Sequence, residues 1–194
     1  MTHRIHAFWD WFVRNARRVE RITNGEDAAG QDLLRQLQRV HRGVTFELGF
    51  APDLGFHLII SADGKRDLFT TVHRIVDAAP NVEGWTFTAL RPRRELPIKA
   101  ALGPIEVDSE KIWFSAVRRD GLVDFSLYFE QFVDDRMIEA VGFLLLDVAL
   151  GEFDTETKVG RIECLPLQSD AAKSAFIPFK ELPGYVDALG VGVM

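Results

Sequence analysis

Residues 111–129 read KIWFSAVRRDGLVDFSLYF, two runs of alternating apolar and polar residues on either side of Asp120-Gly121. An Asp-Gly pair between such runs predicts a β-hairpin with a two-residue turn, because both turn positions require a positive φ. A turn of fixed length also fixes the register, since a slip of one residue would exchange the two faces of a strand. We therefore expect Arg119 to lie opposite Leu122 and the other pairs to follow outward.

The predicted register gives the hairpin an apolar core face and a mixed second face. The expected core pairs are Ala116 with Phe125, Phe114 with Leu127, and Ile112 with Phe129. The expected pairs of the second face are Val117 with Asp124, Ser115 with Ser126, and Trp113 with Tyr128. Trp and Tyr combine a large contact area with a polar group. Trp113, Tyr128, Ser115 and Ser126 therefore form a candidate binding platform, with Trp113 at least partly exposed.

The alternative for this second face is a structural cover. Amphipathic helices are predicted over 6–22 and 27–41, and Asn24-Gly25 joins them into a helical hairpin. The apolar stripe of the first helix contains Phe8, Trp11, Phe12 and Val19. Such a stripe needs a partner, and in this alternative the helical hairpin lies over the second face and closes the platform.

Helices and strands alternate through the rest of the chain. The other predicted helices span 63–79, 134–150 and 182–189, with Asp63 and either Asp134 or Asp135 as N-caps. The other predicted strands span 44–50, 56–61, 85–90 and 160–165. The order ββαβ thus occurs twice. This order indicates an α+β fold with one largely antiparallel sheet and helices on one face, and a ferredoxin-like βαββαβ core fits within it.

We expect a single domain over 1–194. Its parts are a helical hairpin (1–43), a first ββαβ unit (44–91), a connector (92–110), and a second ββαβ unit with the C-terminal helix (111–194). The 194 residues are 47% hydrophobic and 27% charged, as in globular proteins, with a net charge of −6 and one cysteine. No apolar run approaches the roughly 20 residues of a membrane span, and no secretory signal is expected. We therefore expect a cytoplasmic protein without a membrane partner.

Few residues indicate a catalytic, cofactor-binding or nucleic-acid-binding site. No phosphate loop, dinucleotide fingerprint or zinc-helix motif occurs, so no cofactor and no metal is expected. Cys164 is expected to be a small buried side chain. The densest basic cluster contains Arg91, Arg93 and Arg94, but the chain is acidic and lacks the signature of RNA-binding sheets, so nucleic-acid binding is not expected.

The acidic segment 150–160 is the main alternative site. Glu152, Asp154 and Glu156 alternate on what is predicted to be a loop, so three carboxylates could point the same way. They could bind a hard cation or supply a general acid and base, with Glu47 or His57 nearby. The other possibility is a solvated acidic loop.

Five segments resemble those of a family of uncharacterised bacterial proteins. The segments are FWDWF (8–12), ISADG (60–64), DAAP (77–80), WF (113–114) and ALGEFDTETKVG (149–160). The resemblance covers most of the chain and implies a bacterial, cytoplasmic protein. The family has no assigned activity, cofactor or catalytic residues, so no residue role follows from it.

Two functional hypotheses remain open. The first is a non-enzymatic binding module that holds a protein or small ligand through the second sheet face or the acidic segment. The alternative is a small hydrolase or metal-assisted enzyme built on Glu152, Asp154 and Glu156. Convergence of these carboxylates with a histidine in a pocket would favour the enzyme. A homodimer through the exposed aromatic residues stays open.

Overall fold

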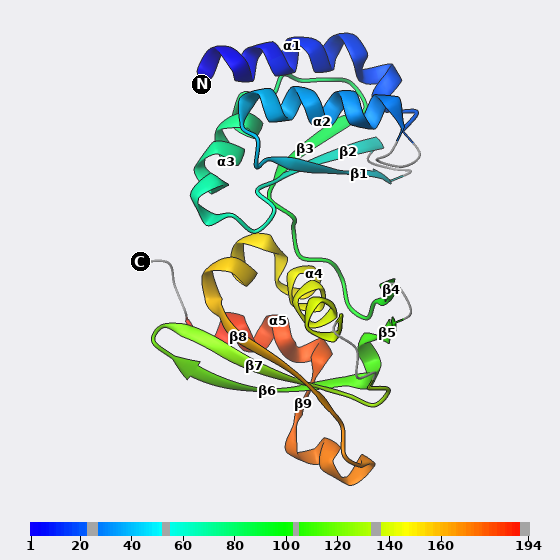
Figure 1. Ribbon diagram of the computed structural model, residues 1–194, viewed down its shortest axis with the longest axis vertical. Helices are drawn as coiled ribbons and strands as arrows, with labels where there is room; N and C mark the ends of the chain where they lie inside the picture. Colours follow the sequence, from blue (N-terminus) through cyan, green and yellow to red (C-terminus); the bar gives the residue numbers. More distant parts are fainter. Residues whose placement is uncertain (23–26, 52–54, 103–104, 133–136, 191–194) are drawn as a thin grey trace. The chain divides into compact units, whose positions relative to one another are not determined.

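The computed structural model describes residues 1–22, 27–51, 55–102, 105–132 and 137–190 (Figure 1). The chain forms two compact units, Met1–Arg91 and Pro92–Met194. Both units contain helices and sheets, so the predicted α+β class is confirmed. The boundary between the units falls at the first residue of the expected connector. The single domain over 1–194 stays a prediction.

The first unit consists of a helical hairpin followed by a ββαβ segment. Its elements are α1 Thr2–Val19, α2 Ala28–Val40, β1 Thr45–Ala51, β2 Gly55–Ser61, η1 Arg66–Leu68, α3 Phe69–Asp77 and β3 Trp85–Ala89. β1 and β2 pair antiparallel, and β3 pairs parallel to β2 after the crossover through α3. The two long helices run antiparallel, since Arg4 lies near Arg39 at one end and Arg18 near Asp32 at the other.

The aromatic residues of α1 form the centre of the first core. Phe12 meets Trp85 edge to face at 4.9 Å between ring centroids, and Trp9 meets Phe87 at 4.7 Å. The indole Nε1 of Trp9 also donates to the carbonyl of Ile75 in α3 over 2.7 Å. Trp9 is thus buried although the predicted stripe omitted it, because α1 packs against both the sheet and α3.

The predicted N-cap at Asp63 is wrong. Asp63 and Gly64 both have a positive φ, 54° and 73°, and form a turn after β2. The helix itself begins at Phe69, after the short 3-10 turn of η1. Two successive left-handed residues reverse the chain here, and the Asp63 carboxylate pairs with Lys65 at 2.9 Å instead.

The second unit repeats the ββαβ order. Its main elements are β6 Ile112–Arg119, β7 Leu122–Phe129, α4 Ile138–Lys158, β8 Val159–Pro166, β9 Ile177–Pro178 and α5 Leu182–Ala188. Its shorter elements are β4 Lys99–Leu102, β5 Ile105–Asp108, and the 3-10 turns η2 Ser109–Lys111, η3 Asp170–Ala175 and η4 Phe179–Glu181. The sheet order is β8-β7-β6-β9, with β8 parallel to β7.

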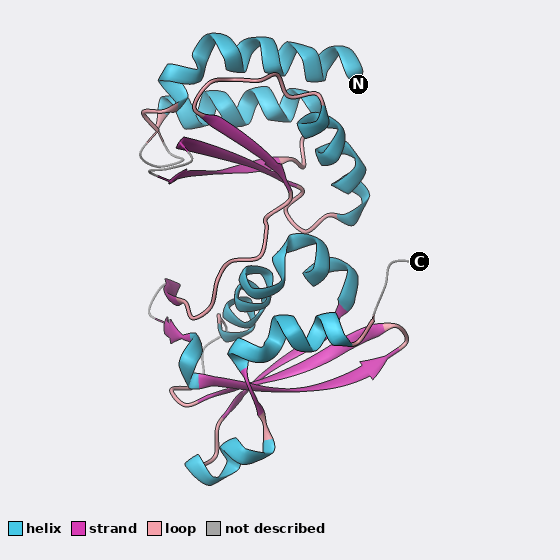
Figure 2. Cartoon of the chain, turned by 180° about the vertical axis from the view of Figure 1, so that it is seen from behind, coloured by secondary structure: helices cyan, strands magenta, loops and turns pink. Residues whose placement is uncertain are grey.

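The predicted hairpin register is confirmed in full. Arg119 pairs with Leu122, Ser115 with Ser126, and all other expected pairs follow. Asp120 and Gly121 have φ values of 50° and 83°, as the turn requires. Figure 2 shows α4 and α5 on one side of this sheet, where Phe114 meets Tyr185 of α5 at 5.4 Å.

Three expectations need correction or stay open. Instead of one sheet, the described residues form a three-stranded sheet in the first unit, a four-stranded sheet in the second, and a β4–β5 hairpin. This hairpin lies within 92–110, where only a connector was expected. A ferredoxin-like core is not confirmed. The expected caps Asp134 and Asp135 and the turn Asn24-Gly25 lie outside the described residues. None of the described helices is both long and apolar enough to cross a membrane.

Candidate functional site

The acidic residues near 152 lie on a helix and not on the predicted loop. α4 continues to Lys158 and is interrupted only at Gly151, whose φ of 77° and ψ of 160° break the helical path. Residues two apart on a helix point about 200° apart around the axis. Asp154 therefore faces away from Glu152 and Glu156, and the predicted convergence of three carboxylates is wrong.

Each acidic side chain has a separate environment. Glu152 is fully buried, whereas Asp154 is 16% exposed and pairs with Lys158 at 2.9 Å and with Arg93. Glu156 is half-buried. Their proposed helpers lie in the first unit, where Glu47 is 3.8 Å from Arg91 and the His57 Nε2 is 2.7 Å from the Thr88 hydroxyl. Burial lowers the pKa of His57.

Arg93 bonds to α4 on both sides of the break at Gly151, at the Leu150 carbonyl and the Asp154 carboxylate. Its guanidinium donates to both oxygens of Asp187 in α5, at 2.8 and 2.7 Å, and also to Asp154. Its Nε donates to the carbonyl of Leu150 over 3.1 Å, which the break at Gly151 leaves without a helical partner. These bonds raise the pKa of Arg93 and lower that of Asp187. This acidic segment therefore has a structural role in the second unit.

The second face of the β6–β7 hairpin lies where the sequence predicted it. Trp113, Ser115, Ser126 and Tyr128 are all half-buried. The Ser115 hydroxyl is 3.3 Å from the Tyr128 hydroxyl. The Ser126 hydroxyl donates to a Glu163 carboxylate oxygen of β8 over 3.4 Å. Trp113 is thus partly exposed, as predicted.

The chain itself occupies the aromatic end of this platform. Phe176 stacks on Tyr128 with 3.8 Å between ring centroids, and the Lys173 ammonium lies 4.6 Å from the centroid of Trp113. Lys173 also pairs with Glu130 and with Asp170. The segment around η3 therefore already fills the positions where a ligand would stack on both rings.

The predicted cover of this face is wrong. The aromatic residues Phe8 and Phe12 of α1 are buried in the core of the first unit, against its own sheet. The apolar stripe of the helical hairpin thus has its partner within residues 1–91, since Trp85 and Phe87 of β3 supply a complementary aromatic surface.

Cys164 is half-buried and its Sγ donates weakly to the carbonyl of Ile138 over 3.4 Å. Burial, together with Glu139 and Glu163, raises the pKa of its thiol to about 11. A thiol with so little thiolate at neutral pH is a poor nucleophile. Within the described ranges, no group of three or more His, Cys, Asp or Glu side chains could hold a metal ion.

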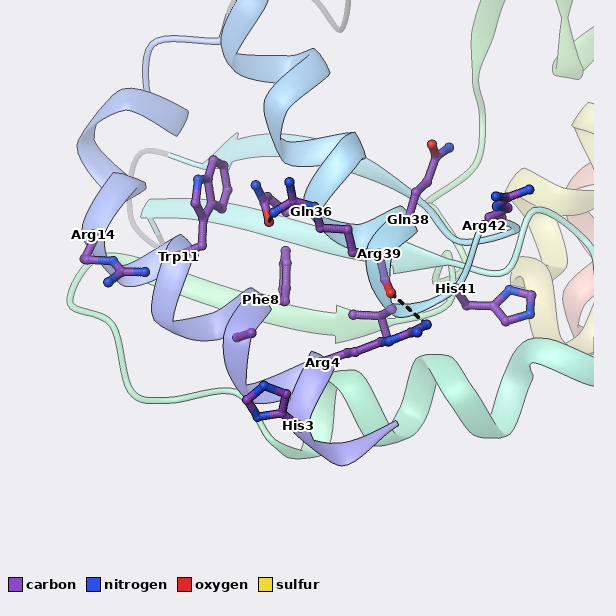
Figure 3. Close-up of a pocket in the computed structure, with 12 residues that line it drawn as sticks. His3, Arg4, Phe8, Trp11, Arg14, Gln36, Gln38, Arg39, His41 and Arg42 are labelled. Atoms are coloured by element: carbon purple, nitrogen blue, oxygen red, sulfur yellow. Dashed lines mark hydrogen bonds between the residues drawn. The ribbon is translucent and has the colours of Figure 1, made fainter.

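A groove lies between α1 and α2 in the first unit. It has a volume of about 1050 Å³. Its floor is apolar and includes the buried Phe8 and Val40, with the half-buried Trp11 and the exposed, small Ala7 beside them. Figure 3 shows Trp11 of α1 and Gln36 of α2 on neighbouring helices along this groove.

The walls of the groove are basic. Arg4 and Arg14 of α1, Arg39 of α2 and the following Arg42 all line it, together with His3 and His41, and none of the described Asp or Glu residues does. Arg4 donates to the Arg39 carbonyl over 3.4 Å, and Arg39 to the Gln36 side chain over 2.9 Å. None of the four guanidinium groups pairs with a carboxylate of any residue that the structure describes.

Several arginines elsewhere in the described chain do pair with carboxylates. Arg18 and Arg35 share Asp32, Arg93 binds two carboxylates, and Arg119 pairs with Asp124 at 3.2 Å. Residues 1–43 hold eight arginines against five Asp or Glu, in a chain whose net charge is −6. The groove thus brings together four arginines that have no ion pair with any described carboxylate.

Sequence reasoning did not identify this groove. The sequence pattern placed Trp11 in the apolar stripe of the first helix and gave no role to the arginines of that helix. The available signal was the excess of arginine over acidic residues in 1–43, since only the antiparallel packing of α1 and α2 brings Arg4 and Arg39 together.

Comparisons of this chain with protein-family models, with curated proteins and with solved structures found no match. The resemblance to a bacterial family therefore stays a prediction.

Proposed function

We propose that this protein is a non-enzymatic binding module and that the α1–α2 groove binds an anionic ligand. The observation that carries the proposal is the set of four arginines around Trp11, none of which has a carboxylate partner among the described residues. Charged walls above an apolar floor are typical of binding sites, because polar groups orient a ligand and apolar contacts retain it.

The alternative of a small hydrolase or metal-assisted enzyme has less support. Its motivating feature was the convergence of Glu152, Asp154 and Glu156, and these side chains point in different directions from α4. Asp154 is also engaged by Arg93 and Lys158. A cytoplasmic location and a bacterial origin, expected from the sequence, belong to the same proposal as the binding role.

Fluorescence anisotropy at low ionic strength tests anion binding, with three labelled probes: a tripolyphosphate conjugate, an oligothymidylate and a glutamate-rich peptide. We expect at least one probe to bind and its affinity to fall with added salt, because exposed charges are screened. The double variant Arg14→Gln/Arg39→Gln should weaken this binding about tenfold, since each exposed ion pair contributes up to about 1 kcal/mol.

The matched control is Arg17→Gln/Arg74→Gln, which removes the same charge from two exposed arginines outside the groove. It should leave the affinity within about twofold of the unmodified protein. Absence of binding by all three probes, or an equal loss in the control, would overturn the proposal.

A further inference from the structure

We infer that the ligand of the groove is an acidic amphipathic helix of a partner protein, an inference that rests on the proposed function. Three features of the groove narrow the ligand class: its length, the distribution of its cations and its apolar floor. Each one disfavours a small anion or a nucleic acid.

The cations are spread along the groove and do not converge on one point. Arg4 and Arg14 are ten residues apart on α1, which corresponds to about 15 Å along the axis at 1.5 Å per residue. Arg39 and Arg42 extend the basic wall along the other side. A single phosphate group could contact only one part of this arrangement, so an extended ligand with several negative charges fits better.

The floor of the groove requires apolar groups on the ligand. Ala7 and Trp11 present carbon surface between the basic walls, and the small side chain of Ala7 leaves space beside the indole. An amphipathic helix can place leucine-like side chains at i, i+3, i+4 and i+7 into such a groove and present carboxylates to the arginines on both sides. It would pack along α1 and α2 as a third helix.

A single-stranded nucleic acid fits less well. Such ligands gain affinity by stacking successive bases on aromatic side chains. Phe8 is only 1% exposed, which leaves Trp11 as the one Trp, Tyr or Phe of the lining with an accessible ring.

The test compares two peptides of equal composition, about 16 residues long and made of glutamate and leucine. In one, the leucines follow helical spacing; in the other, their order is scrambled. We expect the patterned peptide to bind at least tenfold more tightly than the scrambled one. Ala7→Leu fills the groove without a change of charge and should weaken binding of the patterned peptide by about fivefold or more. The control Val13→Leu lies on the exposed part of α1 outside this groove and should leave the affinity unchanged.

The outcomes separate this inference from the proposed function. Equal binding of the two peptides, or tighter binding of oligothymidylate or tripolyphosphate than of the patterned peptide, would overturn the helical ligand but retain an anion-binding groove. Failure of every probe would overturn both. An unchanged affinity in Ala7→Leu would also contradict the inference. Circular dichroism of each variant checks that the fold is intact.

Discussion

Replacement of Arg93 by methionine should destabilise the second unit by about 2 kcal/mol. The change keeps the aliphatic stem but removes the bonds to Asp187, Asp154 and the Leu150 carbonyl. A charge-assisted hydrogen bond contributes about 1.5–3 kcal/mol at buried sites. Arg93 is 32% exposed, so solvent screening reduces the sum of its bonds to a value near the middle of that range.

Urea unfolding monitored by circular dichroism measures this loss, and the matched control is Arg119→Met. Arg119 also pairs with an aspartate, Asp124, but its side chain is 67% exposed. The control should therefore lose at most about 0.5 kcal/mol. Arg93→Lys keeps the charge but loses the bidentate contact with Asp187. The stability of this variant should therefore lie between those of the methionine variant and the unmodified protein.

An Arg93→Met variant whose free energy of unfolding lies within about 0.5 kcal/mol of the unmodified protein, or an equal loss in Arg119→Met, would contradict this prediction. Either result would mean that the break at Gly151 does not depend on the Arg93 side chain for its stability.

Four further predictions concern the second unit. Gly142→Ala should destabilise it by about 1–3 kcal/mol in urea unfolding, because a Cβ there would lie 2.5 Å from the Cys164 Sγ. A second change, Cys164→Ala, should restore most of that loss. Gly121→Ala should lower the free energy of unfolding by about 1 kcal/mol in the same assay, because the φ of 83° at this position is unfavourable for a residue with a Cβ. Alkylation of Cys164 should stay slower than in the unfolded chain until the pH approaches its raised pKa of about 11. Arg93 lowers the pKa of Asp187. The stability that this pair provides is therefore present above the ordinary aspartate pKa near 3.9 and is lost as the pH falls through the lower native value. The difference in free energy of unfolding between the unmodified protein and Arg93→Met should accordingly narrow in acid.

The β6–β7 hairpin could be predicted because its determinants are local. Asp120-Gly121 supplies two residues that adopt a positive φ, and the alternation on either side fixes which face is buried. The half-buried state of Trp113 and Tyr128 followed from the same register. That Lys173 and Phe176 cover them did not follow, because this contact joins residues more than 40 positions apart.

The acidic segment was mispredicted because a glycine usually ends a helix. At Gly151 the helical path breaks, but α4 resumes at Glu152 and continues to Lys158. Side chains satisfy carbonyls near the break: the Thr155 hydroxyl of α4 donates to the Leu146 carbonyl over 3.1 Å, and Arg93 donates to the Leu150 carbonyl. No local pattern indicates that an arginine 57 positions away provides this bond.

The groove was beyond prediction for a similar reason. A helical pattern shows which residues of α1 share a stripe, but not which residues of α2 lie opposite. Whether an arginine such as Arg14 has a carboxylate partner depends on that packing, and so does the space beside Ala7. The excess of arginine over acidic residues in 1–43 indicates a basic surface but does not reveal its shape.

The most direct test of the binding site is a nitrogen-15 correlation spectrum that resolves the four tryptophan indoles, assigned by single substitutions. Addition of the patterned acidic peptide should shift the Trp11 indole resonance, and this shift should disappear in Arg14→Gln/Arg39→Gln. The Trp113 resonance should stay unchanged, because the β6–β7 face is not the site. A shift of Trp113 with none at Trp11 would contradict the account.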